Sequence, residues 1–95
     1  MPLSFEWDDE KAASNLHKHG IPFEYAACVF SDARRCDSED DRKDYGEERR
    51  VTVGYVNERL LVVTYTERGE QTIRLISARK ATRHEQKNHH DHLST

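Results

Sequence analysis

The sequence contains little cysteine, which cross-links a chain, and little proline, which interrupts helices and strands, with two of each in 95 residues, and it has one tryptophan. Cys28 and Cys36 form no C-x-x-C pair, so the spacing typical of a structural zinc site is missing. The N-terminus has no apolar export segment, and no stretch approaches the about eighteen apolar residues that a membrane helix needs. The sequence therefore favours a cytoplasmic protein without a membrane span.

The chain also lacks the overall positive charge typical of nucleic-acid-binding domains, since its formal net charge is −3. Charge is unevenly distributed, because residues 67–95 carry six bases and four acids whereas residues 1–31 carry two bases and five acids. The C-terminal third is the cationic end. The length suits one domain with a modest core, and we assign residues 1–95 to it, with a polar tail from about Asn88 that is expected to fray.

Two helices are predicted near the N-terminus. Asp8 is placed to cap the run D-E-K-A-A-S-N-L-H-K-H, and Gly20 is placed to end it. On this helix Asn15 falls in an outward polar stripe, and the residues expected to face inward are Ala12, Ala13 and Leu16. Pro22 suits the first turn of a second helix. Its expected apolar face is Phe23, Ala26, Ala27 and Phe30.

Three β-branched segments, at 50–56, 60–66 and 72–78, are separated by turn residues and predict an antiparallel meander. We expect Val51, Val53 and Tyr55 to face inward. A fourth strand is compatible with residues 33–38, followed by an exposed acidic loop at 37–44. Thr82-x-x-Glu85 is a capping-box pattern that starts a final helix. The fold class is thus α+β, with two N-terminal helices, an antiparallel sheet of three to four strands and a C-terminal helix.

The junction between the last strand and the final helix is the predicted working surface, because it gathers Arg74, Arg79 and Lys80. A helix N-terminus offers backbone N–H groups and a positive dipole, and guanidinium groups add paired donors for phosphate or carboxylate. If the ligand is RNA, attack of a 2′-hydroxyl on the neighbouring phosphate needs a proton acceptor, a proton donor and cations, and no metal.

Candidates for each role are present. Histidine side chains titrate near neutrality, so His19 could act as acid or base, and Glu47 could be the base. Arg49, Arg74 and Arg79 could hold the phosphate bidentately.

Each candidate also has a simpler interpretation. His19 is favoured at a helix C-terminus by the helix dipole, and Glu47 beside Arg49 could be a surface charge pair. Arg79 and Lys80 could be a solvated helix start, although cations are disfavoured there. The rival function is a non-catalytic binding module whose cationic surface docks an acidic partner protein. The six histidines lack the spacing of a zinc site, so we expect no metal and no cofactor.

Three motifs in order resemble the BrnT family of bacterial toxins. They are the run from Phe5 to Ala26, Y-G-E-E-R at 45–49 followed by Gly54, and I-R-L-I-S-A-R-K-A-T at 73–82 with Glu85. The resemblance implies a RelE-like ribonuclease fold and the toxin component of a type II toxin-antitoxin system. It further implies a cytoplasmic endoribonuclease that arrests translation and is neutralised by a BrnA-type antitoxin, which binds operator DNA in a hetero-oligomer.

The positions that match the family pattern are Lys11, Asn15, Lys18, His19, Glu47, Arg49, Arg68, Ser77, Arg79 and Lys80. From these and the junction we predict four catalytic residues, His19, Glu47, Arg49 and Arg79. The predicted RNA-binding or phosphate-binding residues are Lys11, Lys18, Arg68, Arg74 and Lys80. The final segment departs from the family, because Glu85 is followed by Q-K-N-H-H-D-H without Tyr or Phe.

Overall fold

The computed structural model describes residues 3–40 and 47–93 of the chain. Its helical segments are α1 (Asp9–His19), α2 (Phe23–Ala26), the 3₁₀ helix η1 (Ala27–Ser31) and α3 (Arg83–Leu93). Its strands are β1 (Ser4–Glu6), β2 (Cys36–Asp40), β3 (Arg49–Val56), β4 (Arg59–Glu67) and β5 (Thr72–Lys80). The predicted α+β class is confirmed.

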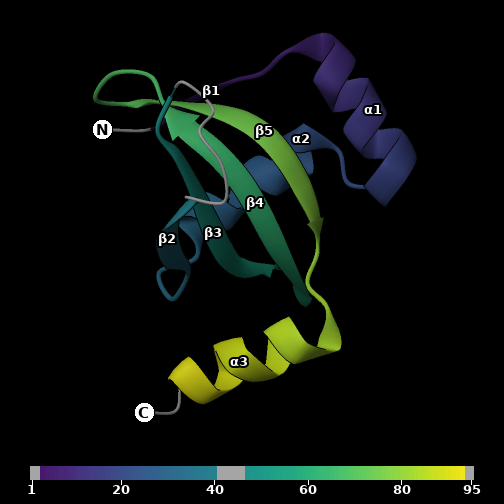
Figure 1. Cartoon of the computed structure of the whole chain (residues 1–95), viewed down its shortest axis with the longest axis vertical. Helices are drawn as coiled ribbons and strands as arrows, with labels where there is room; N and C mark the ends of the chain where they lie inside the picture. Colours follow the sequence, from purple (N-terminus) through teal and green to yellow (C-terminus); the bar gives the residue numbers. More distant parts are fainter. Residues whose placement is uncertain (1–2, 41–46, 94–95) are drawn as a thin grey trace.

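The described strands form one sheet in the order β1-β5-β4-β3-β2 (Figure 1). The predicted meander is confirmed, since β3, β4 and β5 pair antiparallel in sequence. The count of three to four strands was too low, and the sheet is not wholly antiparallel, because β1 pairs with β5 in parallel. A strand of three residues shows no alternation long enough to be recognised in a sequence.

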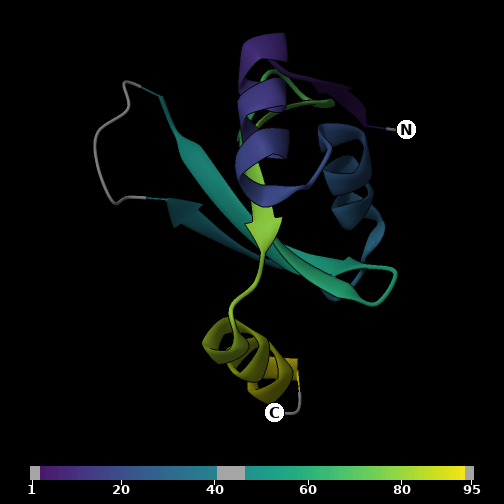
Figure 2. The same cartoon turned by 90° about the vertical axis from the view of Figure 1, so that its right-hand side faces the viewer.

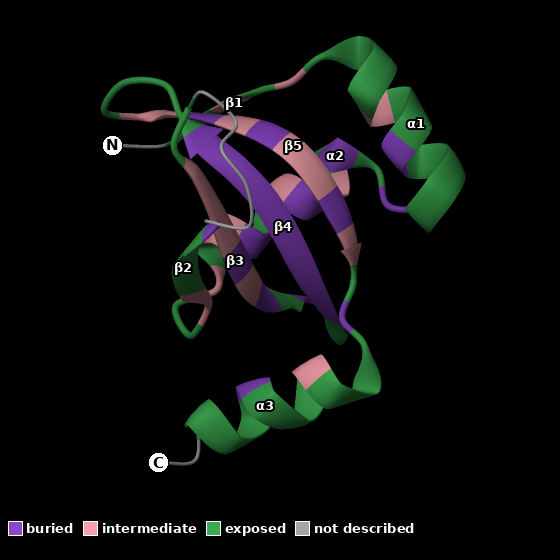
Figure 3. Ribbon diagram, in the orientation of Figure 1, coloured by how far each residue is buried: buried purple, intermediate pink, exposed green. Residues whose placement is uncertain are grey.

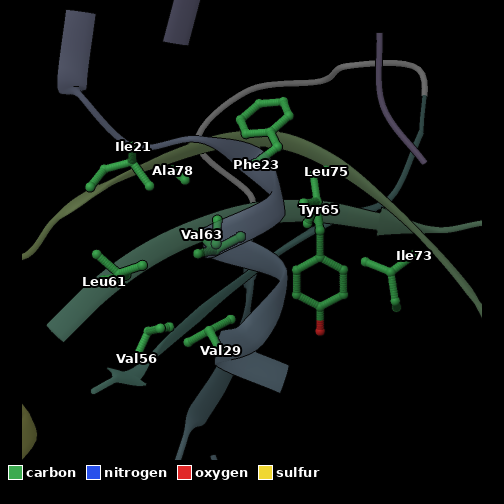
Figure 4. Close-up of a cluster of buried hydrophobic side chains, with 11 residues drawn as sticks. Ile21, Phe23, Val29, Val56, Leu61, Val63, Tyr65, Ile73, Leu75 and Ala78 are labelled. Atoms are coloured by element: carbon green, nitrogen blue, oxygen red, sulfur yellow. The ribbon is translucent and has the colours of Figure 1, made fainter. Parts of the chain in front are cut away.

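The sheet has an inner face covered by helices and an outer face. α2 and η1 lie across the inner face, α1 lies beside β5, and α3 lies beyond the C-terminal end of β5, apart from the other helices (Figures 1 and 2). Side chains of α2, η1, β3, β4 and β5 fill the core, with Phe23, Leu61 and Leu75 almost wholly buried (Figure 4). β4 is buried at every position except its two ends, as expected for the central strand (Figure 3).

The prediction for the faces of β3 was wrong. Thr52, Gly54 and Val56 are buried against the helices, whereas Val51 and Val53 are half-buried on the outer face and pack with its smaller apolar cluster. The reason is a close approach of η1. A Cβ on Gly54 would lie 2.9 Å from a methyl carbon of Val29, so this face accepts only the smallest residue there.

The predicted ends of α1 are confirmed, but its inward face was only partly right: Ala12 packs against the core, whereas Ala13 is exposed. The Asp8 side chain accepts hydrogen bonds at the N-terminus, and Gly20 closes the C-terminus at φ 71°. Leu16, however, is 48% exposed, and Asn15 is buried. α1 lies beside β5, whose backbone N–H and C=O groups need hydrogen-bond partners at this edge. The amide of Asn15 can bind these groups, and a leucine side chain cannot.

Three further boundaries differ from the predictions. The second helix is one turn of α-helix, α2, continued as the 3₁₀ helix η1. β2 covers Cys36–Asp40, two to three residues later than predicted, so part of the expected acidic loop is a strand and residues 41–44 lie outside the described residues. The tail was expected to fray from Asn88, but α3 continues to Leu93 because His89 is buried against the Tyr55 ring, with centroids 5.7 Å apart.

Candidate functional site

Two adjoining hollows lie at the outer face, and we name them by their surroundings. The α1 hollow, about 330 Å³, is lined by Lys11, Ser14, Asn15, Lys18, His19, Arg49, Ile76 and Ser77. The sheet groove, about 520 Å³, is lined by His19, Ser38, Glu39, Asp40, Val51, Val53, Val62, Thr64, Ser77, Arg79 and Glu85. His19 and Ser77 line both, so the two hollows meet at these side chains.

The α1 hollow is held in place by Asn15. Its amide nitrogen donates to the carbonyl oxygen of Ala78 at 2.9 Å, and its amide oxygen accepts from the backbone N–H of Ala78 at 3.0 Å. β1 covers only the first residues of β5, so this amide satisfies backbone groups beyond the point where β1 ends. The same amide donates to the carbonyl oxygen of Ile21 at 3.1 Å and so fixes the turn after α1.

Positive charge dominates the α1 hollow. Lys11, Lys18 and Arg49 line it together with His19, and no carboxylate occurs among these lining residues of the described chain. Arg49 comes from β3, and its Nε lies 3.5 Å from a carboxylate oxygen of Glu47. The hollow therefore offers three cations and an imidazole to an anion of phosphate size.

The sheet groove differs in chemistry. Its floor is apolar, because Val51, Val53 and Val62 belong to neighbouring strands, with Val53 directly opposite Val62. The groove is also lined by the carboxylates of Glu39, Asp40 and Glu85, of which Asp40 is buried, and by the guanidinium of Arg79.

The Arg79–Glu85 pair closes one end of the groove. Two guanidinium nitrogens of Arg79 donate to the two carboxylate oxygens of Glu85 at 2.8 and 2.9 Å. The predicted capping box is confirmed, since the backbone N–H of Thr82 donates to Glu85 and the backbone N–H of Glu85 donates to the Thr82 hydroxyl. The hydrogen bonds from Arg79 outweigh partial burial and lower the pKa of Glu85 to about 2. Glu85 is therefore ionised near neutral pH, and its two hydrogen bonds fix the position of the Arg79 guanidinium.

The predicted junction of three cations does not form. β5 pairs with β4 as far as Lys80, so Arg79 and Lys80 belong to a strand and not to a helix start. Arg74 lies near the other end of β5 and pairs with Glu6 at 2.7 Å. Lys80 borders a different hollow, together with Tyr55 and Gln86.

The remaining predicted residues divide between two places. Glu47 and Arg68 line a separate hollow, and their charged groups lie 3.6 Å apart. The structure thus brings Lys11, Lys18, His19 and Arg49 together, places Arg79 in the adjoining groove, and keeps Glu47, Arg68, Arg74 and Lys80 outside both hollows.

Sequence reasoning missed the groove floor and a polar cluster on the inner face. The Tyr65 hydroxyl contacts both carboxylate oxygens of Asp37, at 2.7 and 2.8 Å, and Arg50 and Arg35 each donate to Asp37 at 2.9 Å. Burial opposes ionisation of Asp37, but these hydrogen bonds prevail and lower its pKa. The cluster ties edge strand β2 to β3 and β4. No local pattern reveals it, because Asp37, Arg50 and Tyr65 lie far apart in the sequence.

Residues 3–40 and 47–93 contain neither a metal-binding cluster nor a membrane-spanning helix. No group of three or more His, Cys, Asp or Glu side chains is arranged to hold a metal ion. None of these helices is both long and apolar enough to cross a membrane.

Comparisons with known proteins agree with the fold. Residues 7–85 match the family described as the ribonuclease toxin, BrnT, of type II toxin-antitoxin systems. No curated protein sequence matches the chain. The crystal structure of the Brucella abortus ribonuclease toxin BrnT is similar, with a TM-score of 0.62 and 23% identity over 85% of this chain and 99% of that one. The predicted RelE-like fold needs correction, because the solved structure that the chain resembles is a BrnT toxin. This chain belongs to the BrnT family of ribonuclease toxins of type II toxin-antitoxin systems.

Proposed function

We propose that the protein is a metal-independent endoribonuclease whose reaction takes place at the α1 hollow. The observation that carries the proposal is the convergence of Lys11, Lys18 and Arg49 with His19 around one hollow, in a chain of the BrnT family. Cations around a phosphate stabilise the charge that grows on its oxygens as a nucleophile attacks. An imidazole beside that phosphate can move the proton that the attack releases.

The proposed reaction is internal transfer. The 2′-oxygen of one ribose attacks its 3′-phosphorus, His19 accepts the 2′-hydroxyl proton, and the bond from phosphorus to the 5′-oxygen breaks. The 5′-oxygen takes a proton from an ammonium group, and Lys11 and Lys18 both line this hollow. The products are a 2′,3′-cyclic phosphate and a 5′-hydroxyl. Glu47 lies outside the hollow and contacts Arg49, so we assign it the positioning of that guanidinium.

Membership of a toxin family supports a proposal for the cellular role. We propose that cleavage in the cytoplasm arrests translation and that a BrnA-type antitoxin neutralises the chain in a hetero-oligomer that binds operator DNA through the antitoxin. An antitoxin that silences the enzyme must cover the cations of the α1 hollow, so a saturating partner should abolish cleavage.

The test is incubation of the purified, partner-free protein with end-labelled RNA in EDTA. Wild-type protein is compared with His19→Ala, Lys18→Ala and the matched control Lys87→Ala, since Lys87 is exposed on α3 and lines neither hollow. We expect cleavage by wild type and Lys87→Ala, and about a hundredfold slower cleavage by His19→Ala because proton transfer contributes on this order. Lys18→Ala should also cleave more slowly, because the hollow loses one of its cations. Loss of activity in EDTA would refute metal independence. Intact RNA with wild type, together with salt-sensitive binding to an acidic partner, would favour a non-catalytic binding module.

A further inference from the structure

We propose that the α1 hollow and the sheet groove together form one nucleotide site, in which the α1 hollow takes the phosphate and the valine floor of the sheet groove takes the base. This inference rests on the proposed function and adds to it the position of the nucleoside. It identifies Val53 and Val62 as base-contacting residues, a role that the cationic residues alone do not suggest.

Charge decides where the phosphate lies. Three carboxylates, Glu39, Asp40 and Glu85, line the sheet groove, and its guanidinium, Arg79, already makes two hydrogen bonds to Glu85. A phosphate in this groove would face like charges at short range. The α1 hollow has the opposite balance, because Lys11, Lys18 and Arg49 line it and no carboxylate is among these lining residues of the described chain. Glu47 contacts Arg49 at 3.5 Å but lies outside the hollow, and it leaves the two lysines as the main positive charge there. The anionic end of a nucleotide therefore fits the α1 hollow.

The floor decides where the base lies. Val51, Val53 and Val62 present methyl groups from the paired strands β3 and β4. An apolar floor with a few polar groups at its rim is typical of pockets that bind small organic groups, and about 520 Å³ lies within their range of roughly 300–1,000 Å³. A nucleobase has two apolar faces and a polar edge, so it can cover the valines and turn its edge to the rim.

The shared residues then face the ribose. His19 and Ser77 line both hollows, which is where the sugar that joins phosphate and base would lie. This position puts the imidazole of His19 beside the 2′-hydroxyl that the proposed reaction deprotonates. The Ser77 hydroxyl can donate to or accept from a ribose oxygen.

The test separates the base from the phosphate. Wild-type protein is titrated with adenosine 3′-monophosphate and, separately, with inorganic phosphate, and binding is followed by ¹H–¹⁵N NMR. The variants are Val53→Thr, which keeps the β-branched shape, Lys18→Ala and the control Lys87→Ala. We expect Val53→Thr to weaken nucleotide binding about threefold to tenfold and leave phosphate binding unchanged, because one apolar contact is lost. Lys18→Ala should weaken both, and Lys87→Ala neither.

Two outcomes would overturn the inference. One is a wild-type affinity for the nucleotide that is no higher than the affinity for phosphate. The other is a nucleotide affinity that is unchanged in both Val53→Thr and a second variant, Val62→Thr, when the NMR spectra of both variants show a folded chain. An RNA cleavage assay on the same samples keeps the two proposals apart. Binding that depends on the valine floor without cleavage refutes the proposed enzyme only, whereas cleavage without that dependence refutes the base site only.

Discussion

The Arg79–Glu85 pair makes a measurable contribution to stability that depends on pH. The perturbation is Glu85→Gln, which keeps the shape of the side chain and removes its charge. A shift in the pKa of Glu85 from the ordinary 4.5 to about 2 corresponds to about 3.4 kcal/mol at 1.36 kcal/mol per pKa unit. The Glu85 and Arg79 side chains are 32% and 38% exposed, and solvent screening reduces this to about 1 kcal/mol.

The direction of the pH dependence follows from the lowered pKa. The carboxylate binds its proton less readily in the folded chain than in the unfolded chain, so its stabilisation is complete above about pH 4.5 and is lost as the pH falls toward 2. Wild type should therefore exceed Glu85→Gln by about 1 kcal/mol at pH 6, or roughly 4–8 °C in Tm. At pH 2 the two proteins should unfold at nearly the same temperature, because half or more of Glu85 is then protonated.

Thermal unfolding followed by circular dichroism at both pH values measures this difference. Glu70→Gln, at an exposed position in the connection between β4 and β5, is the matched control and should leave Tm unchanged at pH 6. Equal Tm values for wild type and Glu85→Gln at pH 6 would show that the pair contributes nothing. A deficit that persists in full at pH 2 would show that the charge is not its cause.

Three further substitutions test the packing that positions the site, each by chemical denaturation. Asn15→Ala should cost about 2–3 kcal/mol, because it leaves the buried backbone groups of Ala78 without their partner, and an unchanged midpoint would contradict this. Gly54→Ala should cost roughly 1–3 kcal/mol, since the added methyl group would collide with η1, and a neutral result would mean that η1 moves freely. Tyr65→Phe should cost about 1–2 kcal/mol by removing the hydroxyl that contacts Asp37, and a smaller loss in an Asp37→Asn background would identify that contact as the cause.

Local patterns predicted the elements whose causes are local. Asp8 and Gly20 bound α1 because a capping carboxylate and a left-handed glycine act within one turn of their own helix. The Thr82–Glu85 capping box forms for the same reason. The three strands of the meander were also predicted, since β-branched residues between turn signals favour strands regardless of the partner.

Predictions that depended on a neighbouring element failed. Asn15 is inside and Leu16 outside because α1 packs beside a sheet edge with free backbone groups, which the helical period cannot show. Thr52 and Gly54 face the core because η1 approaches β3 closely, which no alternation of apolar residues in β3 reveals. We predicted Arg79 at the start of a helix, but it lies in β5. The sequence does not show how far the hydrogen-bonded pairing of β5 with β4 continues.

The sequence by itself determined the family, the α+β class and the residues at the ends of α1 and α3, since motifs and caps depend on neighbours along the chain. Only the tertiary structure decided which charged residues work together. It joined Lys11 and Lys18 of α1 to Arg49 of β3, paired Arg79 with Glu85, and held Arg74 beside Glu6. The physical reason is that charge and hydrogen bonding act over a few ångströms in space, and the fold alone sets which distant residues come that close.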